Sequence, residues 1–259
     1  MDRNNLSAAA ITRGLATRLV GHNIIHYSSL SSTMEKAREE VRRGAPEGTV
    51  IIADEQTAGQ GRIGRVWRSP EGSVALSVIL YPDVVFLPSL IMLASLAVVY
   101  SIEKVTGLNP QIKWPNDILM AGRKVCGILV ENEVRGSVVD YSIVGVGVNI
   151  NLASADLSEV LPLATSLSAE LGRDVPRLDF VRQLLVELDR LYLSVSGGTS
   201  VCGEWRDRLV TLGKRVTATW GKTKYEGIAE SVAEDGSLFL RGADDSLTKI
   251  VAGDVTLRE

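Results

Sequence analysis

The chain has 259 residues, of which 45% are hydrophobic and only 5% aromatic, and its mean hydropathy is +0.13. This length allows one large and one small domain, with cores built mainly from aliphatic side chains. The formal net charge of −3 gives no general electrostatic reason to bind nucleic acid. Cys126, Cys202, His22 and His26 lack metal-ligand spacing, so we expect no zinc site and no disulfide framework.

The amino-terminal part of the chain predicts a helix, a strand and a second helix. Residues 5–20 are expected to be helical, without the apolar core of a signal peptide. A strand over residues 23–27 follows. Ser32 and Glu35 then predict a capping box for a helix that Gly44 closes.

The next segments are strongly apolar. Strands are predicted at residues 50–53 and 74–80, and a loop rich in Gly and Arg extends from the first of them to Arg65. Residues 84–102 carry no formal charge and are long enough to span a bilayer. Pro88 and three serines interrupt this stretch, and its apolar residues recur at helical spacing. We therefore expect a helix buried in the core of a soluble, cytoplasmic protein.

The remaining elements define the fold class. Residues 124–131 and 141–149 are predicted to pair as strands, and residues 178–195 to form a long amphipathic helix. Short strands are predicted at residues 215–220, 225–233, 237–241 and 247–251, with a hairpin turn at Asp235-Gly236. We expect an α+β protein, with a mixed β-sheet and helices packed on one side in residues 1–208. A small SH3-like β-barrel in residues 209–259 would follow.

The segment from Gly59 to Trp67 is the first candidate for chemistry. Its glycines let the backbone approach a ligand closely, and Arg62 and Arg65 can clamp phosphate or carboxylate oxygens. It is not a Walker loop, because no Lys-Ser/Thr pair follows. A flexible surface loop with solvated arginines explains the composition equally well.

The second candidate is Lys113-Trp114-Pro115-Asn116-Asp117, followed by Lys124. A rigid structural turn would account for the first five residues. Lys124, however, opens an otherwise apolar strand, where a cation is costly unless an anion compensates it. We therefore favour an anionic ligand at this position. Cys126 could line a pocket beside Lys124, but a small buried residue is the preferred interpretation.

Gly145 and Gly147 alternate along a predicted strand, which indicates close approach of a ligand or of another part of the chain. Tight packing against a helix would also explain them. Ser32 and Thr33 are adequately explained as a helix cap. Taken without family knowledge, these segments indicate an anion-handling, ATP-dependent ligase or transferase and do not name the substrate.

Three ordered motifs resemble those of the biotin protein ligase family. They are residues 54–67, residues 113–117 with 122–131, and residues 145–149, and the similarity extends over essentially the whole chain. The resemblance implies a fold of the class II synthetase-like, biotin/lipoate ligase type. It also implies ATP with Mg²⁺, a biotinyl-5′-AMP intermediate, and transfer of biotin to a lysine of a biotin carboxyl carrier protein. Acetyl-CoA carboxylase and pyruvate carboxylase are the usual carriers.

The resemblance also assigns residues. The catalytic residues would be Lys124, Arg62 and Arg65. Biotin would be bound by Ser32, Thr33, Gln56, Arg62, Lys124, Gly145 and Gly147. The nucleotide would be bound by Arg65, Trp67, Asn116, Asp117 and Asn149, with Mg²⁺ held mainly by phosphate oxygens and water and by no dedicated protein metal site.

Two departures from the family pattern stand near these residues. Gln60 replaces a frequent arginine, which would weaken a phosphate contact or loop closure, and Met34 replaces a frequent asparagine after Ser-Thr. The segment before Asn23 is too short for the winged helix of family members that repress transcription, so DNA binding is not expected. Members occur as homodimers and as monomers, and the sequence does not decide between them.

Two rival functions are kept. A lipoate–protein ligase is a relative with similar chemistry, although the Trp-Pro-Asn-Asp turn and the Gly-Gln-Gly-Arg loop favour biotin. A non-catalytic nucleic-acid-binding module would use the Gly-Arg loop, but the acidic composition and the scarcity of aromatic stacking platforms argue against it.

Overall fold

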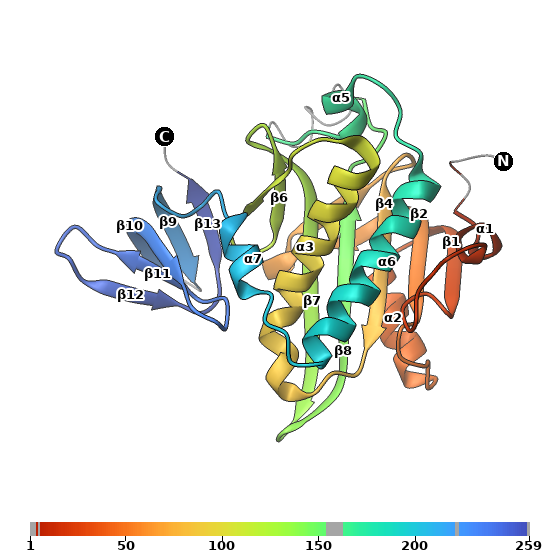
Figure 1. Ribbon diagram of the computed structural model, residues 1–259, viewed down its shortest axis with the longest axis horizontal. Coiled ribbons are helices and arrows are strands. Elements are labelled where there is room, and N and C mark those ends of the chain that lie inside the picture. The colour runs from red at the N-terminus through yellow and green to blue at the C-terminus, as the bar shows by residue number, and fades with distance from the viewer. Residues whose placement is uncertain (1–3, 5, 154–162, 221–222, 258–259) are drawn as a thin grey trace.

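A mixed eight-stranded sheet forms the centre of the larger part of the molecule (Figure 1). The computed structural model describes residues 4, 6–153, 163–220 and 223–257. The strands of this sheet are β1 (Ile24–Leu30), β2 (Val50–Gln60), β3 (Val66–Ser69), β4 (Val74–Leu80), β5 (Gln111–Lys113), β6 (Asp117–Met120), β7 (Arg123–Arg135) and β8 (Val138–Val148). Their order is β1-β2-β4-β8-β7-β6-β5, with β3 paired to β2. Only β1 and β2 run parallel, so the sheet is mixed as predicted.

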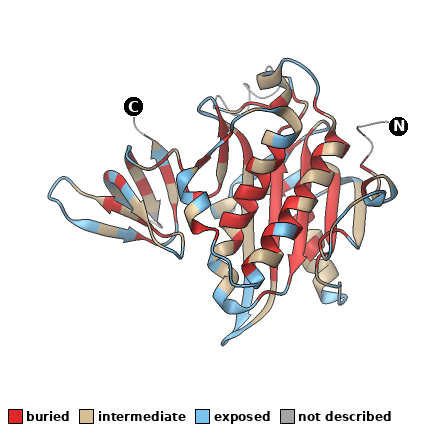
Figure 2. Ribbon diagram, viewed as in Figure 1, coloured by how far each residue is buried: buried red, intermediate tan, exposed pale blue. Residues whose placement is uncertain are grey.

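Two long helices, α3 and α6, lie side by side across one face of the sheet (Figure 1). The helices are α1 (Ala8–Thr12), α2 (Thr33–Arg42), α3 (Leu87–Thr106), α5 (Leu167–Leu171), α6 (Arg177–Ser196) and α7 (Cys202–Asp207). Single 3-10 turns, η1 (Arg62–Gly64) and η2 (Val84–Phe86), accompany them. By length and composition α3 with η2 could cross a membrane, but 61% of its most apolar stretch is buried inside the fold (Figure 2). This is the predicted core helix.

Helices cover both faces of the sheet, so the expectation of helices on one side only was wrong. Along β2, Val50 and Ile52 belong to the main core that includes α3 and α6. Ile51, between them, packs in a separate cluster with Met34 and Ala37 of α2. Successive side chains of a strand point to opposite faces, so the continuous apolar runs of β2 and β4 predict two covered faces. In the structure, α2 covers the second face.

The carboxyl-terminal strands form a second, antiparallel sheet of five strands with the order β12-β11-β10-β9-β13. They are β9 (Arg215–Trp220), β10 (Thr223–Val232), β11 (Leu238–Arg241), β12 (Leu247–Ile250) and β13 (Asp254–Leu257). This sheet is consistent with the predicted SH3-like domain, and the turn at Asp235-Gly236 joins β10 to β11. The sequence patterns missed β13, which has only four residues.

The two sheets are joined next to the Trp-Pro-Asn-Asp turn. Trp114 is 2% exposed, and its backbone N–H donates to Thr211 Oγ1 at 2.9 Å. Its indole Nε1 donates to the carbonyl of Gly236 at 2.8 Å. The backbone of Ile112 exchanges hydrogen bonds with residues 208 and 210. This turn is therefore fixed from the side of the carboxyl-terminal sheet.

The predicted capping box is absent at the start of α2. Ser32 occupies the N-cap, but its side chain makes no cap hydrogen bond. The amide N–H of Thr33 donates to Gln56 Oε1 at 2.7 Å, so β2 supplies the cap. The Glu35 carboxylate accepts from Ser31 Oγ and from Gln60 Nε2. Ser31 and two residues of β2, Gln56 and Gln60, have thus replaced the hydrogen bonds that the motif predicts.

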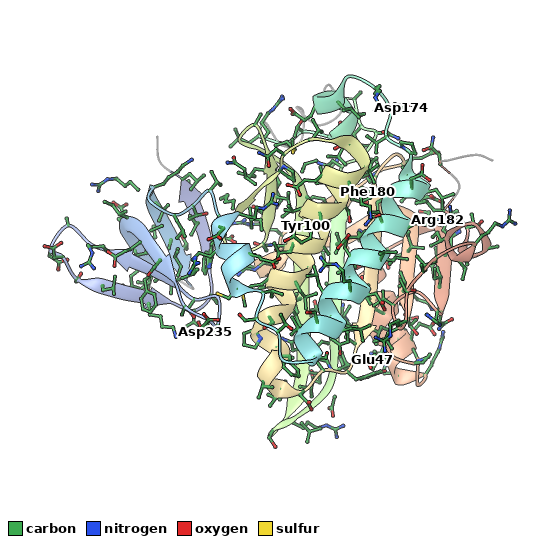
Figure 3. All side chains as sticks on the ribbon, in the orientation of Figure 1. Glu47, Tyr100, Asp174, Phe180, Arg182 and Asp235 are labelled. Carbon is green, nitrogen blue, oxygen red and sulfur yellow. The ribbon has the colours of Figure 1, made fainter. Side chains whose placement is uncertain are left out.

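The helix expected over residues 5–20 is reduced to α1, which ends at Thr12. Gly14 has a φ of +75°, and the backbone N–H groups of residues 18, 19 and 20 all donate to the carboxylate of Asp189. Arg182, labelled on α6 in Figure 3, donates to the backbone carbonyls of residues 10, 11 and 13. Contacts with α6 therefore replace further helical turns.

We predict that Asp189→Asn lowers the free energy of unfolding by about 1–3 kcal/mol, because the amide has one acceptor oxygen for three backbone donors. Urea denaturation followed by circular dichroism measures the change. Asp174→Asn, at an exposed carboxylate ahead of α6, is the matched control and should change stability by less than about 0.5 kcal/mol. Equal stabilities of the two variants would contradict the anchoring role of Asp189.

Candidate active site

A cavity of about 380 Å³ opens on the α2 face of the larger sheet. Its walls come from the start of α2, the end of β2, the loop of residues 61–65, the start of β3, strands β4 to β8, and one residue of the carboxyl-terminal sheet. All three sequence motifs contribute to it, although they lie far apart in the chain. The glycine-rich motif is only partly a loop, because β2 continues to Gln60 and pairs with β3.

Trp67 forms one wall of the cavity and lies against the bare backbone of β7 and β8. A Cβ atom on Gly147 would lie 2.3 Å from Trp67 Nε1, and one on Gly127 would lie 3.0 Å from Trp67 Cζ3. Position 147 therefore needs glycine for the indole ring to lie where it does, and a side chain at position 127 would press against the ring. The alternation of glycines in the third motif is explained in part by packing within the chain.

Gly145 admits Met34 in the same way, since a Cβ there would lie 2.6 Å from Met34 Sδ. Next to Met34, Thr33 Oγ1 donates to Gln56 Oε1 at 3.0 Å and accepts from Ser77 Oγ at 2.8 Å. This end of the cavity is therefore lined by neutral side chains whose orientations are fixed by hydrogen bonds.

Lys124 lies at the centre of the site. Its Nζ is 2.5 Å from Asp117 Oδ1 and 5.4 Å from the centre of a Trp67 ring. Lys113 Nζ lies 3.8 Å from the other oxygen of Asp117. One carboxylate thus faces two ammonium groups, and the indole ring adds a cation–π contact. The cation of Lys124 is held at the junction between the neutral and charged parts of the cavity.

Arg62 and Arg65 line the other end of the cavity, where both meet Asp254 of β13. Arg65 Nη2 lies 2.5 Å from Asp254 Oδ2, and Arg62 Nη1 lies 3.7 Å from Asp254 Oδ1. The first contact is an ion pair without the alignment of a hydrogen bond. Arg62 also donates to Asn116 Oδ1 at 2.9 Å, and the Asn116 amide donates to the carbonyl of Ile128.

Burial lowers the pKa of Arg62, and the neighbouring carboxylate of Asp254 opposes that shift. An arginine stays charged under such conditions, so the buried cation favours an anionic ligand. Four cations and two carboxylates line the cavity, which leaves its lining with net positive charge. The site can therefore bind a molecule with a neutral, weakly polar part and an adjoining anionic part.

Most of the residues singled out in the sequence meet at this cavity. Its lining includes Lys124, Arg62, Arg65, Thr33, Gln56, Gly145, Gly147, Trp67, Asn116 and Asp117. Asn149 is not part of the lining: it is 4% exposed and its amide donates to the carbonyl of Thr165. Ser32 is 1% exposed and lies behind the lining, and its hydroxyl has no hydrogen-bond partner among the described residues.

Cys126 is fully buried in the main core and does not line the cavity. The pairing of β6 with β7 shifts register between Ile118 and Leu119, which breaks the simple alternation from Lys124 to Cys126. Burial raises the pKa of the Cys126 thiol, so this thiol is neutral at physiological pH. The preferred sequence interpretation, a small buried residue, is confirmed.

Asp254 is the functional candidate that the sequence reasoning missed. It follows a glycine near the carboxyl terminus. Strands β3 to β8 lie between Arg62 and Asp254 in the chain, so no local pattern points to Asp254. Lys113 was part of a motif without an assigned role. Its contact with Asp117 follows from the short hairpin that joins β5 to β6.

Across the described ranges, no three His, Cys, Asp or Glu side chains come together in a way that could hold a metal ion. The carboxylates of the cavity lining, Asp117 and Asp254, are already engaged with lysine and arginine side chains. This donor set fits a metal that arrives with a phosphate ligand better than one held by the protein alone.

Two family models match the chain. Residues 27–149 match the biotin/lipoate A/B protein ligase family, and residues 211–258 match the biotin protein ligase C terminal domain. The first match contains all three motifs. The second begins close to the predicted domain boundary.

Relatives and solved structures agree with these matches. A bifunctional ligase/repressor from Bacillus subtilis is 36% identical over 97% of this chain and 79% of its own length. A biotin–[acetyl-CoA-carboxylase] ligase from Mycobacterium tuberculosis is 32% identical over 98% of both chains. The structure of a biotin protein ligase from Aquifex aeolicus, in complex with biotin and ATP, superposes with a TM-score of 0.77 at 27% identity, over 92% of this chain and 99% of that one. On these family matches, and on identities above 30% over almost the whole chain, the chain belongs to the biotin protein ligase family of enzymes.

Proposed function

We propose that this protein activates biotin with ATP and transfers it to a lysine of a biotin carboxyl carrier protein. In the first step a biotin carboxylate oxygen attacks the α-phosphate of ATP, and pyrophosphate leaves. In the second step the carrier lysine amine attacks the acyl carbon of biotinyl-5′-adenylate. The amide forms, AMP leaves with the carboxylate oxygen, and the amine loses a proton.

The observation that carries this proposal is the division of the cavity on either side of Lys124. Neutral polar and apolar groups lie on one side, and Arg62, Arg65 and Asn116 lie on the other. Biotin has a neutral bicyclic ring and a terminal carboxylate, and ATP carries its charge on the phosphates. The two substrates would therefore meet at Lys124, where the new bond forms.

Lys124 would contact the biotin carboxylate and the α-phosphate, whose mutual repulsion opposes the first step. Arg62 and Arg65 would take up charge that develops on the phosphate oxygens. The protein forms no covalent bond in this scheme. Catalysis consists of holding the two anions together and stabilising the charge as it shifts.

The neutral end would hold the ureido ring of biotin. Thr33 and Gln56 are positioned by their mutual hydrogen bonds, and Ser32, which lies behind the lining, would support them and not touch biotin itself. Gly145 and Gly147 would line this end with backbone while they admit Met34 and Trp67. The thioether of Met34 offers apolar contact where many family members place an asparagine.

Trp67, Asn116 and Asp117 would border the nucleotide. Asn149 would act indirectly, because its amide donates to the carbonyl of Thr165, whose backbone N–H donates to the carbonyl of Lys124. Mg²⁺ would enter as part of the MgATP substrate, bound through phosphate oxygens and water, and would neutralise phosphate charge.

The test is incubation with biotin, MgATP and a carrier domain, followed by a streptavidin blot. We expect biotin on the carrier lysine and pyrophosphate release that biotin, and not lipoate, stimulates. Activity with lipoate alone would overturn the choice of substrate. Binding of nucleic acid in a salt-dependent manner, with no biotin-stimulated pyrophosphate release, would overturn the enzymatic assignment.

We predict that Lys124→Ala lowers the rate of biotin-dependent pyrophosphate release by about 100- to 1,000-fold, as the loss of one charge-stabilising group typically does. The melting temperature should change little, because Lys113 remains beside Asp117. Lys104→Ala, at an exposed position of α3, is the matched control and should be fully active. Normal turnover by the Lys124 variant would remove this residue from the mechanism.

We also predict that Asp254→Asn raises the KM for ATP by roughly fivefold, equivalent to the loss of about 1 kcal/mol from a partly exposed ion pair. Without this carboxylate, Arg65, whose side chain is 70% exposed, would have to be ordered by the ligand. Steady-state kinetics at fixed, saturating biotin measure the effect. A lower KM in the variant would mean that Asp254 competes with the phosphates and does not position the arginines.

A further inference from the structure

A chain of polar side chains joins α2 to the start of the arginine-bearing loop, residues 61–65. Gln60 is the last residue of β2, and its side chain lies against α2. Its Nε2 donates to Glu35 Oε1 at 3.0 Å, and its Oε1 accepts from Arg38 Nη2 at 3.1 Å. The chain continues through an ion pair of 2.5 Å between Arg38 Nη1 and Glu131 of β7.

The two ends of the Gln60 amide match their partners in polarity. Glu35 and Arg38 are three residues apart, so both project from the same side of α2. The amide donates to the carboxylate and accepts from the guanidinium. A carboxylate in place of the amide would oppose Glu35, and a guanidinium would oppose Arg38. A glutamine is therefore the side chain that suits both partners at once.

The α2 end of this chain is itself firmly held. Thr33 is tied to Gln56 and Ser77, and the second oxygen of Glu35 accepts from Ser31 at 2.8 Å. At the loop end, Gly61 and Gly64 flank the turn that carries Arg62. Arg62 meets Asn116 and Asp254, and the 70% exposed side chain of Arg65 meets Asp254. On the strand side, Gln60 is thus the last side chain before the arginines that is fixed to the rest of the fold.

Gln60 also borders two cavities. It lines the proposed substrate cavity, and it lines a second hollow of about 480 Å³ beneath the loop, together with Glu131. Displacement of its backbone would therefore open the wall between the substrate cavity and solvent. Biotinyl-5′-adenylate is a mixed anhydride, which water hydrolyses to biotin and AMP, so the wall matters for the yield of the reaction.

We propose that Gln60 is a positioning residue that, by bridging Glu35 and Arg38, holds the arginine-bearing loop closed over the activated biotin. The inference rests on the proposed function, because it concerns retention of the adenylate. It predicts that loss of the bridge allows water to reach the anhydride before the carrier lysine arrives.

The first test is Gln60→Leu, which keeps the approximate size and removes both hydrogen bonds. With biotin and MgATP but no carrier, we expect AMP release to rise roughly tenfold, because two hydrogen bonds to charged groups are lost. Gln183→Leu is the matched control, since it removes a similar 2.8 Å bond from Gln183 to Glu187 on α6, away from the cavity. AMP release at the wild-type rate, or an equal rise in both variants, would overturn the proposal.

The second test needs no substrate. The loop carries two arginines, so trypsin cleavage at Arg62 and Arg65 reports its mobility in the free enzyme. We expect Gln60→Leu to be cut several-fold faster than the wild type and the control, at unchanged melting temperature. Unchanged cleavage would contradict the positioning role even if no adenylate formed. Absence of adenylate in the wild type would contradict the proposed function and not this contact.

The third test exchanges the two side chains. Gln60→Arg alone places a guanidinium beside Arg38, and Arg38→Gln alone removes the ion pair to Glu131. The double variant restores opposite polarity between positions 60 and 38 and keeps a donor for Glu35. We expect it to recover at least half of the adenylate retention lost by Gln60→Arg. A double variant that loses as much as the two single variants combined would refute the bridge.

Discussion

The site depends on a stretch of sheet surface that has no side chains. Gly127 and Gly147 on adjacent strands allow the indole of Trp67 to lie against the backbone, and Gly145 makes room for Met34. Trp67, Met34 and the glycines beside them all line the cavity. A methyl group at Gly147 would meet the indole at 2.3 Å, so even alanine would displace Trp67 and with it the support of Lys124.

The lysine and arginine side chains that line the cavity are held by carboxylates before any ligand is present. Lys124 and Lys113 share Asp117, and Arg62 and Arg65 share Asp254. Each carboxylate faces two cations, so each cluster of three side chains keeps a net positive charge. Preformed cations of this kind stabilise a bound anion without reorganisation at the moment of reaction. Asp254 comes from the second sheet, which makes that sheet part of the site and not only an appendage.

The sequence predicted the long elements well and the local contacts poorly. β4, α3, α6 and the β7–β8 hairpin follow from apolar periodicity, which is a property of the residues themselves. The capping box is absent: Gln56, more than twenty residues away, accepts from the first amide of α2, and the Glu35 carboxylate is taken up by Ser31 and Gln60. The helix over residues 5–20 failed because Asp189 binds the backbone that would have continued it. Helices were expected on one face only, although the continuous apolar run at the start of β2 implies that both faces are covered.

Most of the cavity-lining residues named from the sequence lie in the three motifs, because each motif is a contiguous run that can be read locally. Asp254 did not, because one carboxylate in a four-residue strand has no pattern of its own. Gln60, as a departure from the family, was expected to weaken a phosphate contact or loop closure. Its bridge to Glu35 and Arg38, which becomes apparent once α2 is placed against β2, leads us to propose that it supports closure. Sequence patterns within one segment do not predict contacts between segments that are distant in the chain.

Oxygen transfer tests the central claim, that the biotin carboxylate attacks the α-phosphate of ATP, most directly. Biotin labelled with ¹⁸O in its carboxylate is supplied with MgATP and the carrier domain, and the AMP produced is analysed by mass spectrometry. Attack of the carboxylate on the α-phosphate predicts one ¹⁸O atom in each AMP formed, in proportion to the biotin attached to the carrier. Unlabelled AMP accompanying biotinylation would contradict the account.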